Sequence, residues 1–182
     1  LMSKPSLILI GAGGHAHSCI DVIENLGAFN IVGLIGTEEE LQYECMGYRV
    51  IGTDIDLPEL AAQYKYAIIT VGQIKSPLVR HRLYEQALSL GFKLPAIISP
   101  AAHVSRYAVV EDASIVMHGS IVNAGAKVGK NCIINTNALI EHDVIVGDHC
   151  HISTGAIVNG DANVGSGSFV GSGSIIKEGI TL

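Results

Sequence analysis

An aliphatic residue recurs at every sixth position in the C-terminal part of this chain, and this repeat constrains the fold more than any other feature. The repeat keeps one register from residue 104 to residue 182. An α-helix, with about 3.6 residues per turn, cannot keep a six-residue period on one face, whereas short strands joined by corners can. Three such strands close one coil, so the sequence predicts a parallel β-helix with the repeated side chains inside. The repeated positions are Val104, Val110, Val116, Val122, Val128, Ile134, Ile140, Val146, Ile152, Val158, Val164, Val170, Ile176 and Leu182.

A second column of residues lies four positions after the first, and nearly all of its members are small. Between the columns lie Gly, Asn, Asp and Ser, which form corners easily. Cys132 and Cys150 both belong to the small column and are eighteen residues apart. We therefore expect their thiols to stack in neighbouring coils as interior packing. Because the repeat is still in register at Leu182, we also expect the C-terminal coils to be incomplete.

Residues 1–98 lack the repeat and instead alternate between short apolar strands and amphipathic helices. This alternation is typical of a small parallel α/β domain. Ser99-Pro100 marks the predicted junction, so we expect an α/β domain over residues 1–98 and a β-helix domain over residues 99–182. The expected strands cover residues 7–10, 31–35 and 66–71, and the expected helices cover residues 15–26, 57–63 and 77–90.

A glycine-rich loop joins the first expected strand to the first expected helix. Its sequence, Gly11-Ala12-Gly13-Gly14-His15-Ala16, fits the pattern G-x-G-x-x-A of Rossmann-like domains. Glycines there let the backbone approach a phosphate at the N-terminus of the helix. Because Gly36-Thr37 follows the second strand in place of an acid that would bind a ribose, a mononucleotide or nucleoside diphosphate fits better than NAD. The alternative is a glycine turn that binds no ligand.

Composition and charge exclude several classes of partner. The net charge is −6 and no cluster of Lys or Arg is present, which argues against a nucleic-acid partner. No apolar run is long enough to span a bilayer and no signal peptide is visible, so we expect no membrane partner and a cytoplasmic protein. The four cysteines form no C-x-x-C pair and are expected to be free thiols in a reducing compartment.

Taken together, the motifs of both halves resemble a known family. Gly11–Ala16, Val32–Ile35, Ile51–Thr53 and the repeat block with Asn135-Thr136 and Glu141–Asp143 are similar to the sugar O/N-acyltransferases. This family includes sialic-acid O-acetyltransferases and the N-acetyltransferases of UDP-linked 4-amino-dideoxy-sugars. The resemblance implies a left-handed β-helix and a homotrimer with acetyl-CoA bound between adjacent β-helices. It also implies a UDP-sugar, or another nucleotide-sugar, held by the glycine loop.

The resemblance also assigns roles to individual residues of the β-helix. It implies that His142 is the catalytic base at the acceptor, that Asp143 orients His142, and that Asn135 contacts the substrate. His151 and the backbone N–H of Gly160 are expected near the acetyl carbonyl of acetyl-CoA.

For the nucleotide-sugar, the resemblance implies contacts from the glycine loop and from the loop after the third long strand. The chain departs from its relatives there, because it has Gly72-Gln73 where Gly-Asn is frequent and Gly36-Thr37 where an acidic pair is frequent. Both departures affect the pocket for the nucleotide-sugar. The residues expected to bind this substrate are Gly11, Gly13, Gly14, His15, Gly72 and Gln73.

The sequence thus predicts an acetyl-CoA-dependent N-acetyltransferase of a UDP-linked 4-amino-4,6-dideoxy-sugar, in the synthesis of bacterial surface glycans or glycoproteins. Direct transfer is expected, because Cys132 and Cys150 point inward and cannot form a covalent acyl-enzyme. No metal is expected, because His142, His149 and His151 lie on corners that diverge. The alternatives are a sialic-acid-type O-acetyltransferase and a non-catalytic trimer that only binds nucleotide.

Overall fold

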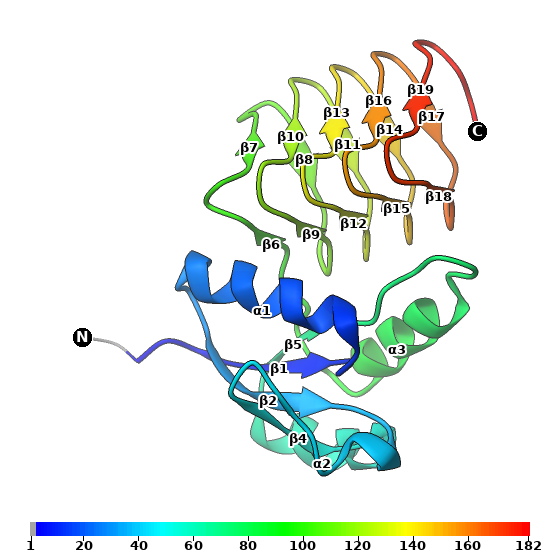
Figure 1. Ribbon diagram of the computed structural model, residues 1–182. Coiled ribbons are helices and arrows are strands. Elements are labelled where there is room, and N and C mark those ends of the chain that lie inside the picture. The colour runs from blue at the N-terminus through cyan, green and yellow to red at the C-terminus, as the bar shows by residue number, and fades with distance from the viewer. Residues whose placement is uncertain (1–2) are drawn as a thin grey trace. The chain divides into compact units, whose positions relative to one another are not determined.

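The computed structural model describes residues 3–182, which form two compact units (Figure 1). The first unit contains the described residues up to Gly72 together with Leu78–Pro95. The second contains Gln73–Pro77 and Ala96–Leu182. The sequence predicted a single boundary between residues 98 and 99, whereas Gln73–Pro77 belongs to the second unit although it lies within the first part of the chain.

The first unit is built on a five-stranded sheet of order β3-β4-β2-β1-β5. Its parallel strands are β1 (Ser6–Ile10), β2 (Asn30–Ile35), β4 (Tyr48–Gly52) and β5 (Tyr66–Ile69). β1 lies between β2 and β5, and its Leu7, Ile8 and Leu9 are fully buried. The alternating strands and helices of the predicted α/β domain are confirmed. The edge strand β3 (Glu44–Cys45) pairs antiparallel with β4 and was not predicted, because two residues have no detectable periodicity.

Three α-helices accompany this sheet: α1 (Gly14–Leu26), α2 (Leu57–Gln63) and α3 (Leu78–Ser89). α1 buries Ala16, Cys19, Ile20 and Ile23, which recur at helical spacing. It ends at Gly27, whose left-handed backbone (φ 66°) lets its N–H donate to the carbonyl of Ile23. Two short 3-10 helices, η1 (Glu38–Glu40) and η2 (Asp54–Asp56), directly follow β2 and β4.

The second unit is a left-handed parallel β-helix, as expected, and its coils stack in chain order (Figure 1). Strands in neighbouring coils pair in parallel with partners eighteen residues apart, for example Ile121 with Leu139. The first sheet contains β6 (Ile97–Ile98), β9 (Ile115–Val116), β12 (Ile133–Ile134), β15 (His151–Ile152) and β18 (Phe169–Val170). The second contains β7 (His103–Val104), β10 (Ile121–Val122), β13 (Leu139–Ile140), β16 (Ile157–Val158) and β19 (Ile175–Ile176). The third contains β8 (Val109–Val110), β11 (Lys127–Val128), β14 (Ile145–Val146) and β17 (Asn163–Val164).

The interior of the β-helix is formed by the two predicted columns. Val128, Ile134 and Ile140 are completely buried, as are Cys132 and Cys150 of the small column. The corners are equally regular, because every sixth residue from Ala113 to Gly179 has a positive φ. Six of these residues are not glycine, and Asp143 (φ 59°) is one of them. Within the described part of the chain, no helix has the length and apolar character that crossing a membrane requires.

Candidate active site

His142 and Asp143 form an ion pair at a corner of the β-helix, between β13 and β14. His142 Nδ1 lies 3.0 Å from Asp143 Oδ2, and about two thirds of each side chain is exposed. Asp143 occupies the left-handed position of the corner, and its carboxylate contacts the preceding residue. The carboxylate accepts a hydrogen bond from Nδ1–H, so Nε2 is left with a lone pair that can accept a proton.

Carboxylates near His142 favour its protonated form. The hydrogen bond with Asp143 is the largest cause that raises the pKa of His142 above its usual value, and the charges of Asp143, Glu141 and Asp161 act in the same direction. Glu141 also orders the corner, because its Oε2 accepts hydrogen bonds from the backbone N–H of His142 (3.1 Å) and from Asn123 Nδ2 (3.0 Å). The imidazole of His142 is therefore a stronger base than that of an ordinary histidine.

Gly160 lies one coil after His142, and the imidazole packs directly against it. A Cβ atom at position 160 would lie 2.7 Å from His142 Nε2 and 2.8 Å from Cε1, so only glycine leaves room for the ring. Within residues 3–182 the N–H of Gly160 donates to no acceptor. A surface cavity of about 600 Å³ opens here, and it is lined by Glu141, His142, Asn159, Gly160, Asp161, Glu178 and Gly179.

Three other residues expected at the site form a separate hydrogen-bonded group in the second unit. His151 Nδ1 is hydrogen-bonded to the carbonyl oxygen of Gln73, and His151 Nε2 lies 3.1 Å from Asn135 Nδ2. Because a carbonyl only accepts, Nδ1 carries the proton and Nε2 accepts from Asn135. Gln73 Nε2 in turn donates to the carbonyl of His149 (2.7 Å). His151 is only 5% exposed, so this group holds Gln73–Pro77 on the β-helix and does not line the cavity beside His142.

The glycine loop lines a second cavity, of about 500 Å³, in the first unit. Gly11 and Gly13 lie in its wall, and Gly14 is the first residue of α1. Gly11 must be glycine, because its φ is 128° and a Cβ would lie 2.6 Å from the backbone nitrogen of Val71. A Cβ on Gly13 or Gly14 would meet no protein atom within 4 Å, so the space above them is open to a ligand.

His15 and Gly72 lie beside this loop rather than in the wall of the cavity. A Cβ on Gly72 would lie 3.4 Å from the Cβ of His15, which is an ordinary contact. The structure thus brings Gly11, Gly13, Gly14, His15 and Gly72 together as neighbours in the first unit. Gln73, which was predicted with them, belongs to the second unit.

Two capping boxes at the rim of this cavity were not predicted. The backbone N–H of Thr37 donates to Glu40 Oε2 (2.8 Å), and that of Thr53 donates to Asp56 Oδ2 (2.7 Å). The sequence signal was present as a repeated Gly-Thr-x-x-acid after β2 and after β4. These boxes account for the unusual Gly36-Thr37, because a Cβ on Gly36 would lie 2.7 Å from Glu40 Oε2.

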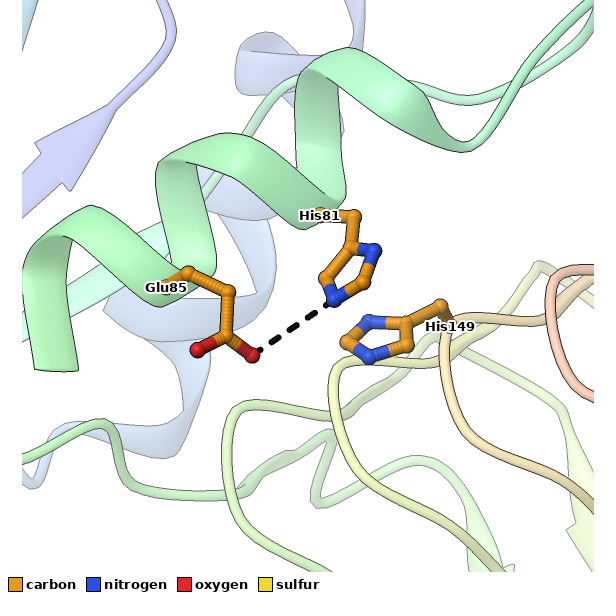
Figure 2. Close-up of side chains that lie close together, drawn as sticks. All are labelled: His81, Glu85 and His149. Atoms are coloured by element: carbon orange, nitrogen blue, oxygen red, sulfur yellow. Dashed lines mark ion pairs between the residues drawn. The ribbon is translucent and has the colours of Figure 1, made fainter.

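The cysteines and the ion pair of α3 lie outside both cavities. All four cysteines are free and buried, and burial raises the pKa of Cys19 to about 12. His81 Nε2 lies 3.5 Å from Glu85 Oε1 one turn further along α3 (Figure 2), an exposed pair of a kind that contributes little to stability.

Comparisons with known proteins relate both parts of the chain to characterised proteins. The family model of the PglD N-terminal domain matches residues 6–87, and that of the bacterial transferase hexapeptide (six repeats) matches residues 125–160.

Several solved structures match almost the whole chain, and three of them are 25–32% identical to it. The acetyltransferase domain of PglB from Neisseria gonorrhoeae FA1090, in complex with acetyl coenzyme A, is 32% identical over 98% of this chain and 85% of that chain, with a TM-score of 0.89. A second structure of this domain is 30% identical over 98% and 96%, with a TM-score of 0.82. A mutant of perosamine N-acetyltransferase from Caulobacter crescentus, in complex with CoA and GDP-perosamine, is 25% identical over 98% and 91%, with a TM-score of 0.85. The chain therefore belongs to the family of hexapeptide-repeat sugar acetyltransferases that have a PglD N-terminal domain.

Proposed function

We propose that this acetyltransferase transfers the acetyl group of acetyl-CoA to the amino group of a UDP-linked 4-amino-4,6-dideoxy-sugar, with His142 as the general base. The observation that supports this proposal most strongly is the corner at which His142, oriented by Asp143, packs against the open N–H of Gly160 beside a cavity. A base, an orienting carboxylate and an oxyanion donor are the groups that acyl transfer to an amine requires.

The two substrates are inferred from the relatives and from the cavities. PglB was solved with acetyl coenzyme A, and perosamine N-acetyltransferase with CoA and GDP-perosamine. The cavity at the glycine loop suits the nucleotide, because the N-terminus of α1 has no side-chain cap and no acidic residue in its first turn. The N–H groups at this helix N-terminus and the positive end of the helix dipole favour binding of a diphosphate next to Gly13 and Gly14.

The reaction proceeds by direct transfer in a ternary complex. The amine nitrogen attacks the thioester carbonyl carbon, and a C–N bond forms while one proton of the amine passes to His142 Nε2. The N–H of Gly160 stabilises the negative charge on the carbonyl oxygen. The tetrahedral intermediate then collapses, the C–S bond breaks, and CoA leaves as a thiolate that takes up the proton. The imidazolium that forms in between is stabilised by Asp143.

We infer that the chain works as a homotrimer with acetyl-CoA bound between adjacent β-helices. Supporting this, apolar side chains face outward from the β-helix and are 38–68% exposed: Val109, Ile121, Ile145, Phe169 and Ile175. Val109 and Ile145 belong to the same sheet, two coils apart, and apolar side chains gathered on one face are typical of surfaces that pack against a partner.

An acceptor panel tests the proposal directly. Enzyme and acetyl-CoA are mixed with UDP- and GDP-linked 4-amino-sugars, with the corresponding 4-hydroxy-sugars, and with free sialic acid, and release of the CoA thiol is followed. We expect turnover with an amino-sugar only. Turnover with hydroxyl acceptors would favour an O-acetyltransferase, and no turnover with any acceptor would favour a scaffold that only binds nucleotide.

A further inference from the structure

An ion pair borders the cavity of the first unit on the side of α3. Arg82 Nη2 lies 3.0 Å from Asp54 Oδ2, and both residues line the cavity. Gln86 orders the pair, because its Oε1 accepts from Arg82 Nη1 (3.4 Å) and its Nε2 donates to the carbonyl of Asp54 (3.3 Å). The three residues link η2 to α3, so the guanidinium and the carboxylate are held side by side.

One further carboxylate of the cavity wall is engaged with the backbone, since Glu40 accepts a hydrogen bond from the N–H of Thr37 in the first capping box. Besides Asp54, only Glu38 contributes a carboxylate to the cavity wall that is not part of a capping box. Arg82 is the only cationic side chain in the wall as described.

Apolar side chains cover the remaining wall close to this pair. Ile55 directly follows Asp54 and is 81% exposed, and Val79 is 53% exposed one turn before Arg82 on α3. Burying apolar area is favourable, so a flat ring that covers these exposed side chains would gain binding free energy. A planar apolar face with polar groups at its edge is the chemistry of a nucleobase.

We propose that Arg82 and Asp54 together select the nucleobase of the nucleotide-sugar. The guanidinium donates to a carbonyl oxygen of the base, and the carboxylate accepts from the neighbouring ring N–H. Uracil, thymine and guanine share this edge of a carbonyl next to an N–H, whereas cytosine and adenine present an amino group next to an unprotonated ring nitrogen. This inference rests on the proposed function, since it presupposes that the cavity binds a nucleotide.

Binding measurements on the full chain test this role. Isothermal titration with UDP, dTDP, GDP, CDP and ADP measures base selectivity, and wild type is expected to prefer the first three. Arg82→Met keeps most of the apolar stem but removes the donors. It should weaken UDP binding by about 10- to 100-fold, as loss of a hydrogen bond from a charged group does, and reduce the preference over CDP. Arg82→Lys, which retains one cationic donor, should restore part of the loss.

Two control variants separate this role from a general effect of charge. Arg49→Met removes an exposed arginine of β4 that does not line this cavity, and it should leave binding unchanged. Because Arg82 and Asp54 are 58% and 40% exposed, Arg82→Met should also unfold at nearly the wild-type temperature. Unchanged selectivity in Arg82→Met would overturn the inference, as would a loss of selectivity that follows Glu38→Gln instead. If wild type bound no nucleotide at all, the nucleotide part of the proposed function would fail with it.

Discussion

At the scale of single residues, the absence of a side chain at position 160 matters as much as the imidazole at position 142. The two residues are one coil apart, and the ring of His142 occupies the space that any Cβ at Gly160 would need. Gly160→Ala should therefore displace the imidazole, and displacement by about 1 Å commonly lowers the rate by about 100-fold. Steady-state kinetics should show a lower kcat with little change in thermal stability. Gly171→Ala is the matched control, since a Cβ there meets only ordinary contacts. Equal kcat values for the two variants would contradict this packing role.

The pH dependence of the reaction should report the carboxylate beside His142. Because the hydrogen bond with Asp143 raises the pKa of His142, the neutral base becomes predominant at a higher pH than in an unperturbed histidine. We expect kcat/KM to rise with pH through this elevated pKa. Asp143→Asn removes the main cause of the raised pKa, so the acid limb of the pH–rate profile should move to lower pH. The plateau value of kcat/KM should fall, because the imidazolium loses its carboxylate partner. A pH–rate profile whose acid limb stays in place would contradict the assignment.

At the scale of elements, the stability of each coil depends on its inward aliphatic side chain. Ile134, the second residue of β12, is fully buried between the side chains of neighbouring coils. Ile134→Ala should lower the free energy of unfolding by about 2–5 kcal/mol through lost burial and the cavity left behind. Urea denaturation measures this loss, and Lys127→Ala, at an outward position of β11, should change the free energy by less than about 0.5 kcal/mol. A loss at Ile134 no larger than at Lys127 would show that the repeat does not form the core.

Elements with a local, repeated signal could be predicted from the sequence, and elements without one could not. Each β-helix strand contributes one aliphatic residue to a strict period, so the inward position of Val128 or Ile140 followed from counting alone. β3 has only two residues, and its hairpin depends on positive φ values at Met46 and Gly47 that no apolar pattern reveals.

The same contrast applies to the candidate sites. His142 and Asp143 are adjacent in sequence, so their pairing could be predicted from the sequence. Gln73 and His151 are 78 residues apart and meet through a backbone carbonyl, which leaves no trace in spacing or composition.

At the scale of the whole molecule, the outward apolar residues of the β-helix predict association. Ile145 on β14 is 48% exposed in the single chain. We expect a mass in solution of three times the 19.1 kDa of one chain. Ile145→Glu should shift the protein toward monomer, because a charge buried in an apolar interface is costly. Light scattering coupled to size exclusion measures this, with Asn163→Glu, at the outward polar position of β17, as the control. A wild-type monomer would contradict the trimer and the acetyl-CoA site between its β-helices.

The most direct test of the whole account compares the turnover of His142→Ala with that of wild type, using acetyl-CoA and a nucleotide-linked amino-sugar. We predict that kcat falls by about 10²–10⁴-fold, the usual contribution of a general base, while the chain stays folded. His103→Ala, another exposed histidine of the β-helix, should retain wild-type turnover. Full turnover by His142→Ala would contradict the central claim that this corner supplies the base.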